Sequence, residues 1–280
     1  MTKGSQLNKK QSKISVLKPL MDIPSSVCKN LLGILTDVDD TLTTKGKLLP
    51  CAFQALAQAK EQGLEVIVVT GRPAGWVDHM ARMWPVDGVI GENGAFYFYM
   101  KNGKIKKRFL QSQKVRNENM KKLNQIAKEI IKNVPGSALA SDQPYRECDL
   151  AIDYCEDVRP LSKNNIQKIC RILDQRGATY KISSIHINAW FGNYDKLKMT
   201  KKFLKEVKNF DPGEIKNHLA FFGDSPNDEP LFAFFTHAIG VANIKKFLSD
   251  LTFPPPWLTT LPSSKGFSEG IKIILEKRRN

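Results

Sequence analysis

Short apolar runs separated by amphipathic segments recur along the chain. The run at 31–36 leads directly into acidic residues, and a helical pattern over 50–62 stops at Gly63 before a second apolar run at 64–69. Buried parallel strands read as continuous apolar runs, and helices commonly end at a glycine. The pattern therefore predicts a strand–helix–strand crossover between neighbouring parallel strands.

The same alternation continues to about residue 93 and returns after residue 193. It predicts helices at 74–83, 196–208 and 229–235 and strands at 88–90, 219–222 and 238–241. Alternating strands and helices are typical of an α/β fold with helices on both faces of a parallel sheet. We therefore expect residues 30–93 and 194–280 to form one doubly wound, Rossmann-like core.

The middle of the chain, residues 94–193, has a different pattern. Alternating apolar residues at 96–100, the turn Lys101-Asn102-Gly103-Lys104 and a further run from Ile105 predict a hairpin. Helices are expected near 115–133 and 161–175, with strands at 148–154 and within 180–190. The interval between residues 70 and 196 is too long for the sheet alone. We expect this segment to be an α+β cap inserted into the core.

The first 29 residues lack hydrophobic periodicity and are rich in Lys, Ser and Gln, which predicts a flexible basic arm. The five cysteines are odd in number and form no Cys-x-x-Cys pair, which favours free thiols in a reducing compartment, the cytoplasm. Apolar runs are far shorter than the roughly 18 residues of a membrane helix, so no membrane partner is expected.

The 280 residues carry a net charge of +15. Residues 32–93 are net acidic, so the basic excess lies in the middle and at the end of the chain. A basic surface is either simply solvated or attracts phosphorylated metabolites or nucleic acid. Nucleic acid is the less favoured partner, because the aromatic pattern of common RNA-binding motifs is missing.

Acidic residues follow two of the predicted strands. The segment 37–41 reads Asp-Val-Asp-Asp-Thr, and 223–228 reads Gly-Asp-Ser-Pro-Asn-Asp. Because ligands bind at the carboxyl ends of parallel strands, both segments are expected at one edge of the sheet. Crowded carboxylates favour a hard cation such as Mg²⁺. A carboxylate can also attack phosphorus, and a second one nearby can exchange protons with the leaving oxygen and with water.

Two further positions fit chemistry on a phosphate. The Thr70 hydroxyl and the Gly71 amide, at the end of another strand, can donate hydrogen bonds to phosphate oxygens. Lys196 opens a predicted helix and can neutralise carboxylate and phosphate charge. Lys198 is a competing candidate for that role.

In this order, the four positions resemble the motifs of the haloacid dehalogenase (HAD) superfamily. Segment 37–41 is similar to its first motif, Thr70 to the second, Lys196 to the third and 223–228 to the fourth. The segment 91–95, Gly-Glu-Asn-Gly-Ala, looks like a turn of subfamily IIB, which includes sucrose-phosphate-phosphatase-like and Cof-like phosphatases. One departure is Leu197, where subfamily IIB commonly has Gly after the lysine.

The resemblance implies a Mg²⁺-dependent phosphatase of small phosphorylated metabolites, most simply sugar phosphates. The nucleophile would be Asp37 and the general acid/base Asp39. The metal would be held by Asp37, Asp39 through its carbonyl, Asp224 and Asp228, and the phosphate by Thr70, Gly71, Lys196 and Asn227.

In subfamily IIB the inserted cap reads the leaving group. Its polar residues Arg146, Asp153, His186, Asn188 and Trp190 are candidates for this contact, with Arg146, His186 and Asn188 preferred. Two alternatives stay open. One is a phosphomutase of the same superfamily, and the other is a basic nucleic-acid-binding protein with a vestigial site.

Overall fold

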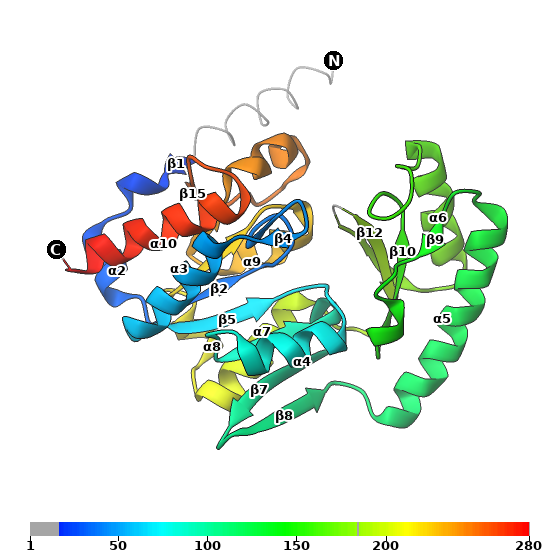
Figure 1. The fold of residues 1–280 in the computed structure, drawn as a ribbon, viewed down its shortest axis with the longest axis horizontal. Helices are drawn as coiled ribbons and strands as arrows, with labels where there is room; N and C mark the ends of the chain where they lie inside the picture. Colours follow the sequence, from blue (N-terminus) through cyan, green and yellow to red (C-terminus); the bar gives the residue numbers. More distant parts are fainter. Residues whose placement is uncertain (1–16, 184, 280) are drawn as a thin grey trace, which may run out of the picture.

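The computed structural model describes residues 17–183 and 185–279. Within these residues, nine strands form a sheet in the order β1–β15–β14–β13–β2–β5–β6–β7–β8 (Figure 1). Neighbours from β1 to β6 run parallel, whereas β7 and β8 are antiparallel additions at one edge. The strands are β1 (Lys18–Pro19), β2 (Gly33–Thr36), β5 (Glu65–Val69), β6 (Gly88–Gly91), β7 (Phe96–Lys101), β8 (Lys104–Phe109), β13 (Leu219–Gly223), β14 (His237–Gly240) and β15 (Trp257–Leu258).

Helices cover both faces of this sheet because successive residues of each buried strand point to opposite sides. On β2, Ile34 packs in the apolar cluster of one face and Leu35 in that of the other. The first face is covered by α2 (Ser25–Asn30), α3 (Pro50–Glu61), α4 (Ala74–Met83) and α10 (Ser263–Arg279), and the second by α7 (Lys196–Lys208), α8 (Pro212–Ile215) and α9 (Glu229–Phe234). This arrangement confirms the predicted α/β fold with a doubly wound sheet.

The strand order reverses direction at β2. From β2 the chain moves to β5 and β6 on one side, and later from β13 to β14 and β15 on the other. Along the chain, β2 is followed by a small hairpin of β3 (Thr43–Thr44) and β4 (Lys47–Leu48) before β5 begins. In open parallel sheets, ligands bind outside the carboxyl ends of the strands at such a reversal point. The fold therefore directs attention to the residues that follow β2 and β13.

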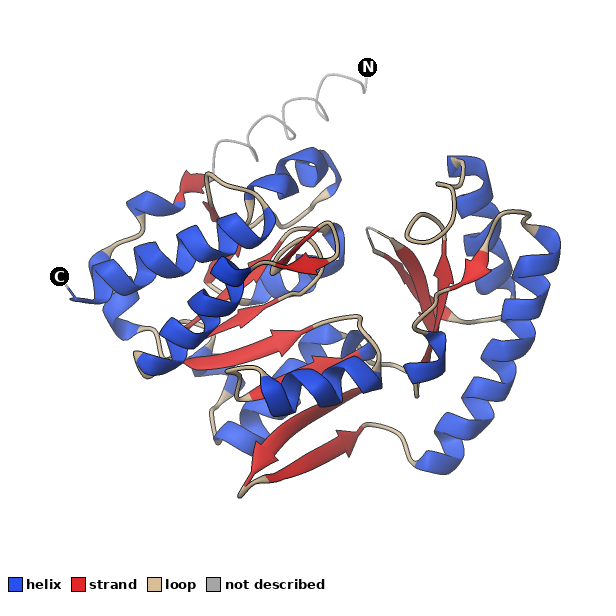
Figure 2. Ribbon diagram, viewed as in Figure 1, coloured by secondary structure: helices blue, strands red, loops and turns tan. Residues whose placement is uncertain are grey.

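A second, four-stranded sheet has the order β11–β12–β10–β9 within the described residues, with two helices on it (Figure 2). Its elements are α5 (Gln113–Asn133), β9 (Ala138–Leu139), β10 (Asp149–Asp153), α6 (Lys163–Gln175), β11 (Thr179–Ile182) and β12 (His186–Trp190). Leucine and isoleucine side chains of these helices and strands form an apolar cluster of their own. We call residues 113–190 the insert and the remainder the core.

The hairpin of β7 and β8 belongs to the core, whereas the sequence analysis placed it in the inserted module. It pairs with β6 and extends the large sheet, with Val89 opposite Phe98. Phe96 and Phe98 are fully buried in the apolar cluster of the core. The alternating pattern identified the hairpin correctly, but the partner of its apolar face is set by tertiary packing.

The prediction of a flexible arm over 1–29 is wrong for residues 17–29, and residues 1–16 lie outside the described residues. Leu20, Ile23 and Cys28 are buried in the core cluster. The Arg278 guanidinium of α10 donates to the carbonyl of Cys28 at 2.8 Å. This segment therefore packs against α10, a helix that the sequence analysis did not predict.

No helix among the described residues is long and apolar enough to cross a membrane.

Candidate active site

The acids that follow β2 and β13 meet at the same edge of the sheet. The two strands are parallel neighbours with Thr36 opposite Phe222, and the Asp37 amide donates to the Phe222 carbonyl at 3.0 Å. This register places Asp37 and Asp224 side by side. Ligand oxygens of Asp37, Asp224 and Asp228 all lie within 4.8 Å of one another, and all three residues are buried.

Lys196, the first residue of α7, provides the cation of this cluster. Its Nζ donates to Asp37 Oδ1 at 3.0 Å and to Asp228 Oδ1 at 2.8 Å, and only 4% of the residue is exposed. Gly94 allows the start of α7 to lie this close, because its φ is +102° and a Cβ there would meet the Asp195 carbonyl at 2.1 Å. Lys198 is directed instead toward Asn193 at the surface. Geometry thus brings Lys196, and not Lys198, to the acids.

This cluster carries more negative charge than positive charge. Burial raises the pKa of Asp37 to about 7, with Lys196 opposing the shift and Asp228 adding to it. Burial and the neighbouring carboxylates also raise the pKa of Asp224. Three carboxylates around one ammonium group, all offering hard oxygen ligands, fit a divalent cation such as Mg²⁺. Asp37, Asp224 and Asp228 are the side chains that would hold it.

Asp224 is oriented by two neutral donors. The Thr41 hydroxyl donates to its Oδ1 at 3.2 Å and the Asn243 amide to its Oδ2 at 3.1 Å. The Asp228 carboxylate accepts the Asp224 backbone amide at 3.2 Å, so the loop after β13 folds back on itself. These bonds fix the acids in position, as expected of a preorganised site.

Asp39 lines the same cavity as Asp37 of this cluster and is bonded to Arg72. Its Oδ1 accepts Arg72 Nη2 at 2.8 Å, and both carboxylate oxygens lie 3.0 Å from Arg72 Nε. Whereas the Asp37 side chain is 8% exposed, that of Asp39 is 23% exposed, so Asp39 faces the opening between core and insert. The sequence analysis missed Arg72, although it follows Thr70 and Gly71 directly at the end of β5.

Of the other residues predicted for the phosphate, Gly71 and Asn227 line the same space, whereas Thr70 is not among its lining residues. Thr70 is fully buried, and its hydroxyl accepts the Arg72 amide at 3.1 Å. Gly71 and Asn227 line a cavity together with Asp37, Asp39 and Lys196. At Gly71 a Cβ would meet Asn93 at 3.2 Å, so a side chain there would crowd the turn after β6.

The insert contributes the other wall of this cavity. Arg146, His186 and Asn188, the preferred cap candidates of the sequence analysis, line it, and all three are buried. The Asn188 amide donates to Asp149 at 3.1 Å, and His186 Nε2 lies 2.8 Å from Glu156 Oε2. Two further cap candidates, Asp153 and Trp190, are outside the lining; Asp153 instead accepts backbone amides of residues 155–157.

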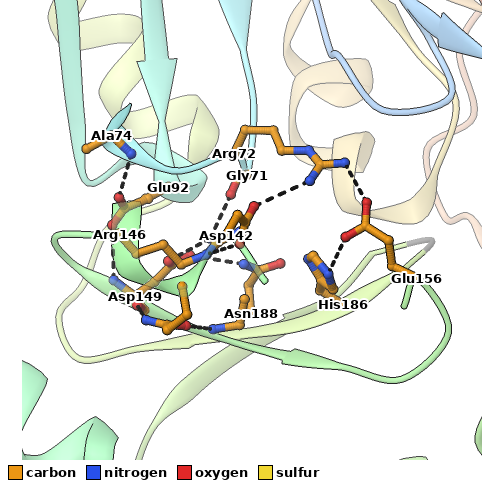
Figure 3. A network of polar contacts seen from close by, with 12 residues as sticks. Gly71, Arg72, Ala74, Glu92, Asp142, Arg146, Asp149, Glu156, His186 and Asn188 are labelled. Carbon is orange, nitrogen blue, oxygen red and sulfur yellow. Dashed lines mark hydrogen bonds and ion pairs between the residues drawn. The ribbon is translucent and has the colours of Figure 1, made fainter. Parts of the chain in front are cut away.

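Arg146 has a different environment from the one expected of a ligand contact. Its guanidinium is enclosed by the carboxylates of Asp142 at 3.0 Å and Asp149 at 2.8 Å. It also donates to the Gly71 carbonyl at 3.0 Å, which ties the insert to the core (Figure 3). Its donors are therefore directed to the protein itself.

Glu92, in the turn between β6 and β7, makes a second tie between core and insert. Its carboxylate accepts the amide of Ala74 at 2.9 Å in the core and those of Cys148 at 2.6 Å and Asp149 at 3.1 Å in the insert. Burial and the nearby Asp149 raise the pKa of Glu92 to about 8. Sequence reasoning identified this turn as a motif but assigned Glu92 no role.

The cavity between these walls measures only about 20 Å³. That is room for about one water molecule. The core and the insert are therefore in a closed arrangement, in which the polar groups above Asp37 bond with one another.

Residues 34–143 match the family described as haloacid dehalogenase-like hydrolase, a span that holds Asp37, Asp39 and Thr70. This part of the chain is similar to the haloacid dehalogenase-like hydrolases. The match agrees with the resemblance that the sequence motifs indicated and supports the enzyme class, a hydrolase.

Solved structures share the fold of this chain almost throughout. A Thermoplasma acidophilum protein has a TM-score of 0.67 at 19% identity, covering 88% of this chain and 99% of that one. A putative HAD/Cof-like hydrolase from Plasmodium vivax has a TM-score of 0.65 at 15% identity, covering 90% and 99%. The sucrose-phosphatase of Synechocystis, solved with sucrose and phosphate, has a TM-score of 0.57 at 14% identity, covering 87% and 97%. At these identities the likeness concerns the fold, insert included.

Proposed function

We propose that this hydrolase is a phosphatase that cleaves phosphate monoesters of small hydroxylated metabolites, with Asp37 as nucleophile. The observation that carries the proposal is the setting of Asp37 at the reversal point of the sheet. It is bonded to Lys196, grouped with Asp224 and Asp228, and followed two residues later by an acid at the cavity opening. Nucleophile, cation and proton donor thus converge on one small space.

In the first step a carboxylate oxygen of Asp37 attacks phosphorus, and the bond from phosphorus to the ester oxygen breaks. Asp39 gives its proton to the leaving alkoxide, which departs as an alcohol. In the second step water attacks the same phosphorus and gives a proton to Asp39, while the bond to Asp37 breaks and inorganic phosphate leaves. Lys196 stays beside Asp37 throughout and offsets negative charge there.

Mg²⁺, held by Asp37, Asp224 and Asp228, would supply positive charge next to the phosphate oxygens. Gly71 and Asn227 line the space that the phosphate would occupy, and the fully buried Thr70 directly precedes Gly71. The assignment of these residues to the phosphate rests on their place around Asp37.

The character of the leaving group is suggested by the wall of the insert. Ser183, His186 and Asn188 line the cavity from that side with hydroxyl, imidazole and amide groups. The guanidinium of Arg146 is already enclosed by two carboxylates. This wall suits a neutral polyol better than a second anionic group, and the Synechocystis protein with the same fold was solved with sucrose and phosphate. A sugar phosphate is therefore the preferred substrate class.

The cytoplasm is the proposed location. No disulfide joins any two of the five cysteines, all of which lie among the described residues, and Cys28 and Cys148 are buried. Free thiols persist in reducing compartments.

The test is release of inorganic phosphate from hexose phosphates, sucrose phosphate, glycerol phosphate and para-nitrophenyl phosphate, with Mg²⁺ and after exhaustive chelation. We expect Mg²⁺-dependent phosphate release and inhibition by Ca²⁺, whose larger and looser coordination shell misplaces the nucleophile. Full activity after chelation would contradict the metal assignment. An isomerised sugar phosphate without phosphate release would instead identify a phosphomutase.

A further inference from the structure

Arg72 binds carboxylates from both sides of the cavity, and Figure 3 shows those of the insert, Asp142 and Glu156. From the core it holds Asp39 through two nitrogens. From the insert, Asp142 lies 3.3 Å from its Nη1 and Glu156 3.2 Å from its Nη2. The Arg72 side chain is only 5% exposed, and its guanidinium also lies 4.5 Å from the centre of the Trp76 ring. One planar cation thus connects the insert directly to Asp39.

Two of the polar ties between core and insert, those at Glu92 and at Arg72, differ in how open they are to solvent. Around Glu92 the bonds run to backbone amides of residues 147–149, and Glu92 itself is fully buried. At the Arg72 tie, the Asp142 side chain is buried, but the Glu156 side chain is 28% exposed. Separating buried amides from their acceptor costs more than separating a partly solvated ion pair. The insert is therefore expected to open at Glu156 and to stay attached at Glu92.

Opening is required for turnover, because a cavity of about 20 Å³ cannot admit a phosphate ester. When the insert moves away at the exposed tie, Arg72 loses Glu156 and Asp142 but keeps Asp39. With two of its three anionic partners gone, the guanidinium is free to change rotamer, and Asp39 moves with it. When the insert closes, the three carboxylates fix the guanidinium from different directions, and the orientation of Asp39 is restored.

We propose that Arg72 is a positioning residue through which closure of the insert orients Asp39 toward the leaving group. The inference rests on the proposed phosphatase function and adds a mechanism by which proton transfer is confined to the closed state. Arg72 itself exchanges no proton. It acts by holding the Asp39 carboxyl group where the ester oxygen, and later the attacking water, can reach it.

The test compares two esters whose need for Asp39 differs. Proton donation matters for the basic alkoxide of an alkyl phosphate and little for the leaving group of para-nitrophenyl phosphate. Arg72→Gln should lower kcat/KM on the alkyl ester that the wild type hydrolyses fastest by about a hundredfold, the order of loss caused by a misplaced group. On para-nitrophenyl phosphate the loss should stay below about fivefold, and Arg72→Lys should fall between wild type and Arg72→Gln on the alkyl ester.

Glu156→Gln tests the connection to the insert, because Glu156 contacts Arg72 and not Asp39. It should show the same preference for the aryl ester, with a loss of about three- to tenfold on the alkyl ester. In the Arg72→Gln background, Glu156→Gln should cause no further loss of this kind. Asp157→Asn removes the same charge from the same exposed loop, and Arg82→Gln removes an exposed guanidinium from α4; both should leave the ratio of the two esters unchanged.

Parallel losses on both esters in folded Arg72 variants would overturn the inference, since they indicate a general structural role. Equal losses from Glu156→Gln in the presence and absence of Arg72 would also overturn it. If the wild type releases no phosphate from any ester, the proposed function fails and this inference with it. An active wild type with an unchanged ester ratio in Arg72→Gln refutes the inference alone.

Discussion

Charged side chains crowd both walls of the cavity, but their charges balance differently. On the core side, Asp37, Asp224 and Asp228 are grouped around a single cation, Lys196. On the insert side, the buried Arg146 is matched by Asp142 and Asp149. The core wall is short of positive charge and suited to bind a cation and a phosphate. On the insert wall both carboxylates bond directly to the guanidinium of Arg146, so these charges mainly hold structure in place.

The largest effect is expected from Asp37→Asn. An amide cannot attack phosphorus, so turnover should fall by more than about a hundredfold with the fold retained. Phosphate release is the measurement, and circular dichroism monitors the fold, with the exposed Asp250→Asn as a matched control. Retention of more than a few per cent of the wild-type rate would rule out Asp37 as nucleophile.

The contrast between the two walls can be tested by removing one cation from each. Lys196→Met and Arg146→Met both leave buried carboxylates unpaired, which typically costs about 3–5 kcal/mol of unfolding free energy. Mg²⁺ should restore a large part of this stability in Lys196→Met and little in Arg146→Met, because only the core acids are arranged to bind it. Urea unfolding with and without Mg²⁺ measures the difference. Equal recovery in both variants would show that the walls do not differ in this respect.

Replacing Glu92 tests the buried tie between the walls. In Glu92→Gln an amide NH₂ group replaces one acceptor oxygen and faces backbone donors of residues 147–149. We expect a loss of about 1–3 kcal/mol in unfolding free energy. Glu61→Gln, an exposed substitution on α3, is the control. Urea unfolding measures this loss. An unchanged unfolding midpoint in Glu92→Gln would mean that these bonds contribute no net stability.

A smaller effect is expected where the insert is thought to meet the leaving group. His186→Ala should change the ratio of kcat/KM between sugar phosphates by about tenfold, since a lost hydrogen bond affects only substrates that reach it. The rate on para-nitrophenyl phosphate should change little. By contrast, we now expect Arg146→Ala to reduce all rates together, because Arg146 is bonded to Asp142, Asp149 and Gly71.

The smallest effect is expected on stability at low pH. The hydrogen bond with His186, together with Arg72, lowers the pKa of Glu156 from an ordinary 4.5 to about 2. Because the pKa is lower in the folded chain, ionised Glu156 stabilises the fold above pH 4.5, and this contribution is lost as the pH falls toward 2. The stability difference between wild type and Glu156→Gln should therefore shrink over that window. A stability difference that stays constant from pH 5 to pH 2 would contradict this role of Glu156.

The sequence predicted the core wall well because its signal is local. Asp37 and Asp224 directly follow apolar runs, and parallel pairing of β2 and β13 is enough to bring them together. The network of Arg72, Glu92 and Glu156 escaped prediction because its members are far apart in the chain and meet only through the fold. Nothing in the residues around Glu156 indicates that its partner is Arg72, 84 positions away.

Two parts of the fold were missed for a related reason. Helix α10 has glycines at 266 and 270, which lower intrinsic helix propensity. Those glycines are required by packing, since a Cβ at Gly270 would meet the Phe222 ring at 2.4 Å. The segment around Leu20 has too few apolar residues to form a core alone, yet it is buried once α10 is in place.

The last strand of the large sheet has a consequence for the behaviour of the protein in solution. One side of β8 pairs with β7, and β8 is the end of the strand order. Lys104 and Lys106 belong to this edge strand, and both are exposed. A second copy that aligned its own β8 there would bring like charges into apposition, which opposes intermolecular strand pairing. The lysines of the β8 edge thus oppose edge-to-edge aggregation of the protein.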